Sequence, residues 1–292
     1  MLIAKSESIK TNTFKLGICL VLPCLLLLLL MINACSPERK MVKRFLADEN
    51  PRHALLIAPQ FIYKTNLKEE TFDSLKIKDE RLFDSVLLAN TVFINKIQDS
   101  LFIANYMLGM DMELKRFGFK VYREDATTSF MEIDSNAYFI NLAQVEIEES
   151  YYTTREEVLI YNSEYYHDHQ LNAAFISSWI EVNEINANTS NHNVYFSTDV
   201  ITDYLDGEFV LDYLSNQVKY LYEIDTLKPA DIYNFAFTLG RTYAGYTFDL
   251  LMNTYLKENL PEEKLSGKYW RYNPELDNLF YAVDDKFVPL EN

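Results

Sequence analysis

NAYFINLAQVEIEESYY, residues 136–152, has the pattern of a β-strand at the centre of a sheet. The half AYFINLA is apolar on both faces of an extended chain, whereas glutamates alternate with valine and isoleucine over residues 145–148. A strand covered on both faces is a continuous apolar run, and a strand with one face in water alternates. The segment therefore predicts a sheet whose middle is covered by helices.

Further segments extend this sheet. Runs of alternating or continuous apolar character predict strands at residues 53–63, 172–185 and 193–205. We expect residues 136–152, 172–185 and 193–205 to be antiparallel neighbours, with residues 186–193 as an Asn- and Ser-rich hairpin loop. Another strand follows Gly118, and the end of the chain predicts a hairpin turned around Asn273–Asn278.

Helical periodicity predicts helices at residues 79–97, 99–117 and 229–259. Asp79 and Asp99 are N-cap residue types, and Gly118 is suited to end the second helix. The apolar face of that second helix is predicted to comprise Leu101, Ala104, Leu108 and Leu114. The β-branched and aromatic cluster at residues 91–94 favours a short strand as the alternative to the first helix.

The third predicted helix starts at Pro229, a residue suited to a first helical turn, and stops before Pro261. It contains the small residues Gly240, Ala244 and Gly245. Small residues let a second backbone approach closely, so we expect core packing there; a lipid-facing helix pair is the alternative.

Together these segments predict an α+β fold, with a mixed, mainly antiparallel sheet of about four or five strands, helices packed on it and a C-terminal hairpin. We expect a signal peptide at residues 1–34, a lipidated tether at 35–50 and a single globular domain at 51–292. Little regular structure is expected at residues 36–50, 64–78, 124–135, 153–170 and 186–193.

The N-terminal segment has the order of a bacterial lipoprotein signal. Three lysines and an apolar run over residues 16–32 precede INAC, residues 32–35. Asn33 departs from the usual small residue of a lipobox, and a transmembrane anchor is the alternative, although Pro23 interrupts the run. We expect Cys35 to be lipidated and to anchor the protein in the outer membrane.

Composition excludes several classes of function. The three cysteines of the chain are Cys19, Cys24 and Cys35, so a mature domain without another thiol has no disulfide, cysteine nucleophile or cysteine-ligated metal. Basic residues crowd into residues 39–44 and suit anionic lipid headgroups. The whole chain nevertheless carries a formal charge of −16, which argues against a nucleic-acid partner.

Motifs for nucleotide or hydrolytic chemistry are missing from the sequence. It contains no dinucleotide-binding glycine motif, no P-loop, no nucleophile elbow and no zincin motif. With only seven glycines, few positions could bring backbone amides close to a phosphate. We therefore expect no catalytic residue and no cofactor.

His167, Asp168 and His169 are the one cluster suited to a metal. Residues two apart on an extended chain point to the same side, so the two imidazoles could share a zinc ion. The sequence identifies no third ligand, although Glu164 or Glu149 could complete a site. The function would then be that of a metal-dependent hydrolase.

Aromatic residues are frequent, with 21 Tyr and 19 Phe. Many will be strand and core material. The candidates for an exposed binding surface are Tyr151, Tyr152, Tyr165, Tyr166, Trp270 and Tyr272. A flat patch on the order of several hundred Å² would suit a protein partner, whereas rings lining a groove would suit a glycan.

Four runs carry a resemblance to a known group of proteins: NAYFINLAQVEIEE, GFKVY, GRTYAGYTFD and the ending YWRYN…DDKFVPL. Together they resemble uncharacterised cell-envelope lipoproteins of Bacteroidetes over most of the mature chain. This resemblance implies a location but no activity. More loosely, the layout is similar to compact α/β domains of lipoproteins that assist envelope assembly and secretion, including curli export and lipopolysaccharide insertion.

In Bacteroidetes, lipoproteins bound for the cell exterior usually carry acidic residues soon after the lipidated cysteine. Residues 36–40, SPERK, offer one acid followed by bases, which favours a domain facing the periplasm. We therefore expect a non-catalytic lipoprotein that binds an envelope protein partner through exposed aromatic residues and the loops at 153–170 and 186–193. A glycan-binding module and a hydrolase using His167 and His169 are the alternatives.

Overall fold

A computed structural model describes residues 36–68, 83–185, 194–215, 217–282 and 287–290. The predicted signal peptide, Cys35 and the predicted loop at 186–193 lie outside these residues. The chain divides into two compact units, where one domain was expected. Unit 1 takes the described residues among 1–49, 250–271 and 279–283, and unit 2 takes the rest. No helix in the described part of the chain is long and apolar enough to cross a membrane.

Unit 2 is built on a mixed sheet. Within the described residues this sheet has seven strands in the order β11-β6-β5-β4-β1-β3, with β2 attached to β4. Their bounds are β1 Arg52–Ile57, β2 Tyr63–Asn66, β3 Phe119–Tyr122, β4 Ala137–Ile160, β5 Ser163–Glu184, β6 Val194–Thr202 and β11 Val288–Pro289. The central strand β4 pairs parallel with β1 and β2 and antiparallel with β5, and β5 pairs antiparallel with β6.

The α+β class and the mixed sheet are confirmed, and the three predicted antiparallel segments form the consecutive strands β4, β5 and β6, with β5 between the other two. The expected number of four or five strands is wrong. The strand β2, YKTN, is mostly polar, and β11 has only two residues, so neither shows an apolar pattern in the sequence. The sheet is also less antiparallel than expected, because β1, β2 and β3 join it through parallel pairs.

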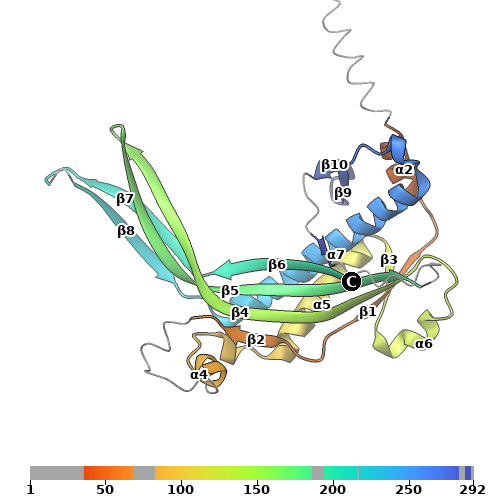
Figure 1. Cartoon of the computed structure of the whole chain (residues 1–292), viewed down its shortest axis with the longest axis horizontal. Helices are drawn as coiled ribbons and strands as arrows, with labels where there is room; N and C mark the ends of the chain where they lie inside the picture. Colours follow the sequence, from red (N-terminus) through yellow and green to blue (C-terminus); the bar gives the residue numbers. More distant parts are fainter. Residues whose placement is uncertain (1–35, 69–82, 186–193, 216, 283–286, 291–292) are drawn as a thin grey trace, which may run out of the picture. The chain divides into compact units, whose positions relative to one another are not determined.

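The helices of unit 2 lie on this sheet (Figure 1). They are α4 Phe83–Ala89, α5 Asp99–Arg116, α6 Thr127–Phe130 and the part of α7, Pro229–Asn259, that ends at Asp249, with 3₁₀ turns η2 Ile94–Lys96 and η3 Glu124–Ala126. Tyr106 of α5 donates a 3.2 Å hydrogen bond to Ser178 of β5, and Tyr243 of α7 donates one to Asp199 of β6. These buried contacts fix α5 and α7 against the antiparallel half of the sheet.

The face that α5 buries differs from the predicted one. Leu101, Ala104 and Leu108 are exposed, and of the four predicted residues only Leu114 is buried. The residues that α5 buries are Phe102, Tyr106, Met107, Gly109, Met110, Glu113 and Leu114. Successive residues of a helix are about 100° apart around its axis. The aromatic, methionine and glycine positions define the buried face, and most of the predicted leucines lie outside it. Asp99 is not the cap: the N-cap is Gln98, and Asp99 is the first residue of the helix.

The crossing of α5 and α7 depends on two glycines. A Cβ atom at Gly240 would lie 2.0 Å from the carbonyl oxygen of Tyr106, and one at Gly109 would lie 2.1 Å from that of Phe237. No side chain fits into such gaps, so the two backbones touch. This confirms the close core packing expected near Gly240.

We expect Gly240→Ala to lower the free energy of unfolding by about 1–3 kcal/mol or more, because the added methyl forces the two helices apart. Gly245→Ala is the matched control, since its Cβ would meet only the Phe117 ring at 3.9 Å. A helical Gly→Ala change without a clash stabilises by up to about 1 kcal/mol. Urea unfolding of both variants measures the difference, and equal stabilities would contradict the close crossing.

Unit 1 contains a helix where a tether was expected. Helix α2, Pro37–Leu46, starts at the N-cap Ser36, whose side chain accepts from the amide of Arg39 at 3.2 Å. Phe45 packs against Tyr255 with ring centroids 5.3 Å apart. The expectation of an unstructured segment at 36–50 is therefore wrong, because a capped helix start and an apolar anchor follow one another there.

The predicted hairpin near the C-terminal end is present, and the short strand β11 follows it and pairs with β6. The strands of the hairpin are β9 Tyr269–Asn273 and β10 Asn278–Ala282, and a 3₁₀ turn η4, Glu262–Lys264, lies between α7 and β9. The predicted turn around Asn273–Asn278 is confirmed.

Candidate functional site

The most prominent feature of unit 2 is an arm of two stacked hairpins (Figure 1). We define the arm as residues 151–171 of β4 and β5 together with the hairpin of β7, Tyr204–Asp212, and β8, Gln217–Asp225. Strand β6 stops beside Ala173, so β4 and β5 continue beyond the sheet paired only with each other. The expected loop at 153–170 is wrong: this stretch is the outer half of the longest pair of strands.

The turn at the tip explains why this hairpin was not predicted from the sequence. Ile160 pairs with Ser163, and the two residues between them, Tyr161 and Asn162, have φ of 50° and 63°. Two consecutive positive φ values define a type I′ turn, which usually contains glycine. Here a tyrosine takes the strained position and is 83% exposed.

The hairpin β7–β8 was not predicted at all. Residues 204–212 and 217–225 do alternate. Leu205, Phe209 and Leu211 share one side of the first strand, Val218, Tyr220, Tyr222 and Ile224 share one side of the second, and the charged residues lie on the opposite sides. This period-two pattern was the signal that could have found them. The alternation gives each strand of the hairpin one apolar and one charged face.

The two hairpins stack their apolar faces through aromatic rings. His167 and His169 of β5 lie with ring centroids 4.4 Å apart, and they meet Tyr220 at 4.9 Å and Tyr222 at 4.7 Å, respectively. Phe209 adds a contact to Tyr220 at 4.6 Å. The histidines are therefore packing residues between two layers of the arm.

The opposite faces of the arm carry paired charges. Arg155 makes a bidentate ion pair with Asp168, at 2.6 and 3.0 Å, and its guanidinium lies 4.5 Å from the Tyr166 ring centroid. Lys219 pairs with Asp212 at 3.0 Å. Acidic side chains outnumber basic ones on both hairpins. Such exposed pairs add little stability but keep the outer faces hydrated.

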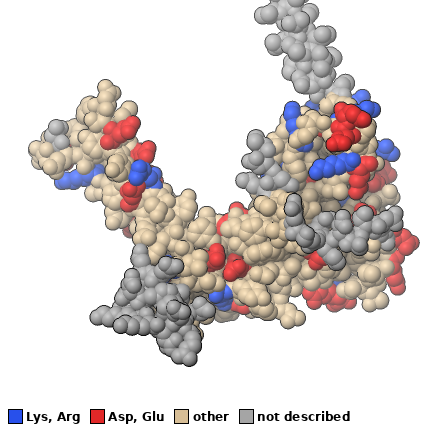
Figure 2. All heavy atoms as spheres, in the orientation of Figure 1, with Lys and Arg blue, Asp and Glu red and all other residues tan. Residues whose placement is uncertain are grey.

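Large apolar side chains are exposed along the arm, and the highest exposed fractions include those of Tyr161, Tyr213 and Leu214 at the two tips. The exposed residues of this kind are Tyr152, Leu159, Tyr161, Tyr166, Tyr204, Val210, Tyr213, Leu214, Leu221, Tyr222 and Ile224. Figure 2 shows much of the arm as uncharged surface, with charged groups clustered part of the way along it. Exposure of several large apolar side chains on one projecting arm is typical of an interaction surface.

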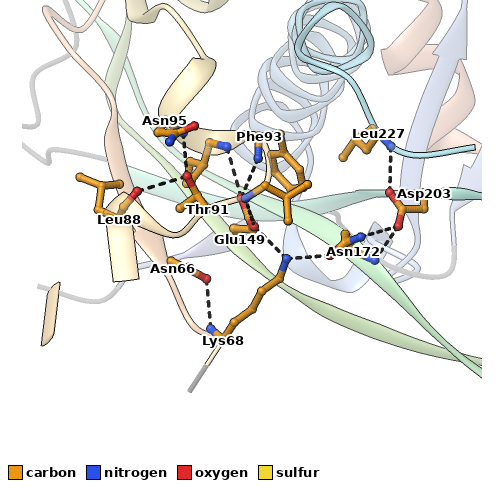
Figure 3. A network of polar contacts seen from close by, with 12 residues as sticks. Asn66, Lys68, Leu88, Thr91, Phe93, Asn95, Glu149, Asn172, Asp203 and Leu227 are labelled. Carbon is orange, nitrogen blue, oxygen red and sulfur yellow. Dashed lines mark hydrogen bonds and ion pairs between the residues drawn. The ribbon is translucent and has the colours of Figure 1, made fainter. Parts of the chain in front are cut away.

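A buried ion pair lies at the root of the arm (Figure 3). Lys68 and Glu149 are 2.7 Å apart and 4% and 0% exposed as side chains. The Glu149 carboxylate also accepts the backbone amides of Val92, Phe93 and Ile94 at 2.8, 3.2 and 3.2 Å. Because these amides bind the carboxylate, the chain near residue 92 continues neither the predicted helix 79–97 nor the alternative strand. The helix observed there is α4 alone, and residues 79–82 lie outside the described part of the chain.

The network continues from Lys68 into the second hairpin. Lys68 donates to the Asn172 side chain at 2.7 Å, and the Asn172 amide donates to Asp203 at 2.7 Å. The other oxygen of Asp203 accepts the backbone amide of Leu227 at 2.8 Å, just before α7. One polar chain thus joins β4, β5, the β6–β7 junction and the start of α7.

The structure does not gather the predicted aromatic candidates into one surface. Tyr152 and Tyr166 are exposed, but on opposite faces of the hairpin, whereas Tyr151, Tyr165 and Tyr272 are half-buried. Trp270 is 2% exposed, so its inclusion as a surface residue was wrong. The residues that sequence reasoning missed are those of β7, β8 and the tips.

The predicted metal ligands are likewise not all brought together. His167 and His169 share a face, as expected for alternate residues, but Asp168 points to the other face and pairs with Arg155. Glu149 is held by Lys68 and three amides. Among the described residues, no group of three or more His, Cys, Asp or Glu side chains is placed to hold a metal ion.

A cavity of about 310 Å³ lies beside β6, lined by Phe196, Ser197, Thr198, Asp199, Tyr246 and Val288. Burial raises the pKa of the Tyr243 hydroxyl far above its usual value, so it stays protonated and donates to Asp199. The hydroxyls and carboxylate here serve the packing of α7 on β6.

No protein-family model matches the chain, and no curated protein is recognisably similar to it in sequence.

We expect Lys68→Met to lower the free energy of unfolding by about 3–5 kcal/mol, because it leaves the Glu149 carboxylate buried without its cation. The double variant Lys68→Met/Glu149→Gln should regain part of this loss, since neither position of the pair then carries a charge. A double-mutant cycle of urea unfolding gives the coupling energy. Simple additivity of the two single variants would contradict a coupled pair.

The stacked histidines should make the arm sensitive to acid. Burial, and then the neighbouring His167, lower the pKa of His169 below its ordinary 6.5; the facing Glu156 opposes this shift. The stacked arm therefore takes up protons less readily than separated hairpins, so stacking is strongest above pH 6.5 and weakens as the pH falls below it. NMR of the Tyr220 and Tyr222 rings should show this loosening, and His169→Phe should remove it.

Proposed function

We propose that this protein is a lipid-anchored envelope lipoprotein that acts without catalysis as a binding and assembly factor, and that the arm is its working surface. The supporting observation is the arm itself, two stacked hairpins whose tips expose Leu159, Tyr161, Tyr213 and Leu214. Large apolar side chains at the ends of a projecting arm favour binding to a partner.

The chemistry of the arm favours an envelope protein as that partner. Exposed tyrosines and leucines supply the anchors that dominate protein interfaces, and the acidic flanks suit a surface with basic residues around an apolar pocket. Tyr161 is suited to be an anchor, because its turn holds it outward at a conformational cost. Anchoring through Cys35 would hold the protein near such partners at the outer membrane, on the periplasmic side.

A second candidate function is insertion of the arm hairpins into lipid. Strands β7 and β8 each have nine residues, about 30 Å at ~3.3 Å per residue, close to the thickness of a bilayer core. Each strand has one apolar and one charged face. Backbone groups in lipid must be paired, so several copies of the chain would have to join edge to edge. Glu156, His167 and His169 on the apolar face of the other hairpin oppose this reading.

The two remaining alternatives have weaker support. A glycan-binding module needs rings lining a groove, and the exposed rings of the arm lie on separate faces and tips. A hydrolase using His167 and His169 needs a third ligand that converges with them, and the described residues contain no group of three side chains that could hold a metal ion.

A photo-crosslinking residue at Tyr161 or Tyr213 tests the arm in native membranes. We expect crosslinks to one protein from both tips and none from Lys120, an exposed control position elsewhere in unit 2. Crosslinks to lipid and to a second copy of the chain would favour the second candidate. A pattern that is the same at Lys120 as at the tips would refute both.

Truncating the tip should remove partner capture without unfolding the protein. We expect Leu159→Ser/Tyr161→Ser to weaken partner recovery at least tenfold, since interface anchors contribute about 2 kcal/mol or more each. Exposed residues contribute little to stability, so the unfolding midpoint should stay within a few degrees. Cys35→Ala is the separate test of the anchor and should lose incorporation of labelled fatty acid.

A further inference from the structure

Helix α2 of unit 1 presents two faces of opposite chemistry. The buried face comprises Glu38, Val42 and Phe45. Phe45 packs on Tyr255, and Glu38 accepts the Ser266 hydroxyl at 2.7 Å. These contacts lock the rotation of the helix about its own axis, so the direction of its other face is set.

That other face is basic. Lys40, Lys43 and Arg44 are exposed and spaced i, i+3 and i+4, which places them on one side of the helix, opposite Val42 and Phe45. None of the three makes an ion pair with any described residue. The described part of unit 1 has more basic than acidic side chains, whereas unit 2 is strongly acidic. Lys and Arg side chains are visible at the surface around α2 (Figure 2).

The position of α2 in the chain identifies what this face meets. The helix is capped by Ser36, directly after Cys35 and four residues after the apolar run that ends at Ile32. With lipid attached at Cys35, or with the run itself in the bilayer, the first turn of α2 would start at the level of the headgroups. A basic helix face at that level complements anionic lipid.

We infer that the face formed by Lys40, Lys43 and Arg44 binds the anionic headgroups of phospholipids. Three free cations beside a membrane insertion point attract acidic lipids, and the attraction is screened by salt. Because α2 cannot rotate against unit 1, this contact orients unit 1 on the bilayer. The inference rests on the membrane anchoring in the proposed function but not on the role of the arm.

The test uses the full chain in vesicles of phosphatidylcholine alone or with roughly one third phosphatidylglycerol, a composition that gives a negative surface potential. Acetylation of Lys40 and Lys43 is followed by mass spectrometry, with the exposed Lys120 as reference. We expect acetylation at Lys40 and Lys43 to be several-fold slower only in the anionic vesicles, and about 1 M salt to abolish the difference. Equal rates in both vesicles would overturn the inference.

A charge-reversed variant gives a second readout. In detergent with equal amounts of the two lipids, native mass spectrometry should show the wild-type chain retaining phosphatidylglycerol several-fold more than phosphatidylcholine. Lys40→Glu/Lys43→Glu/Arg44→Glu should lose this preference, and Lys120→Glu should keep it. A preference that survives in the triple variant would also overturn the inference. Failure of the anchor is distinguishable, because the chain would then not float with vesicles at all.

Discussion

The buried pair of Lys68 and Glu149 is the interaction on which the rest of unit 2 depends. Removing two charges from water costs several kcal/mol each, and their attraction offsets this only when every remaining oxygen and proton is satisfied. Here three backbone amides and Asn172 complete the set. The cost of an incomplete set forces separate segments into one arrangement: the end of β2, the turn before η2, and the point where β4 and β5 leave the sheet.

The network around Lys68 and Glu149 also determines how the arm is built. A two-stranded ribbon is marginally stable by itself, so the outer halves of β4 and β5 need a second layer. The hairpin β7–β8 supplies it, and Asp203 holds the start of that hairpin and the start of α7 through a single carboxylate. The layers meet through the rings of His167, His169 and Tyr220. The result is an arm with a thin aromatic core and apolar tips that its own packing leaves uncovered.

Unit 1 also depends on a buried carboxylate. Glu38 is buried and bonded to Ser266, which ties the helix after Cys35 to the chain beyond α7. The segment that could have been a flexible tether is instead a helix of set orientation. Its basic face and the acidic body of unit 2 give the protein a division of charge that suits a domain held beside a membrane.

The sequence by itself determined the strong periodic elements: the sheet strands around residues 136–152, the helices α5 and α7, the glycine contact at Gly240 and the terminal hairpin. Local pattern suffices there because burial of one face imposes a period on the chain. Only the tertiary structure decided which face of α5 is buried, that residues 153–170 form strands, and that Asp168 turns away from His167 and His169. Each of these depends on a partner distant in sequence, such as Glu149 for residues 92–94 or β8 for the histidines, and a single chain pattern contains no record of such partners.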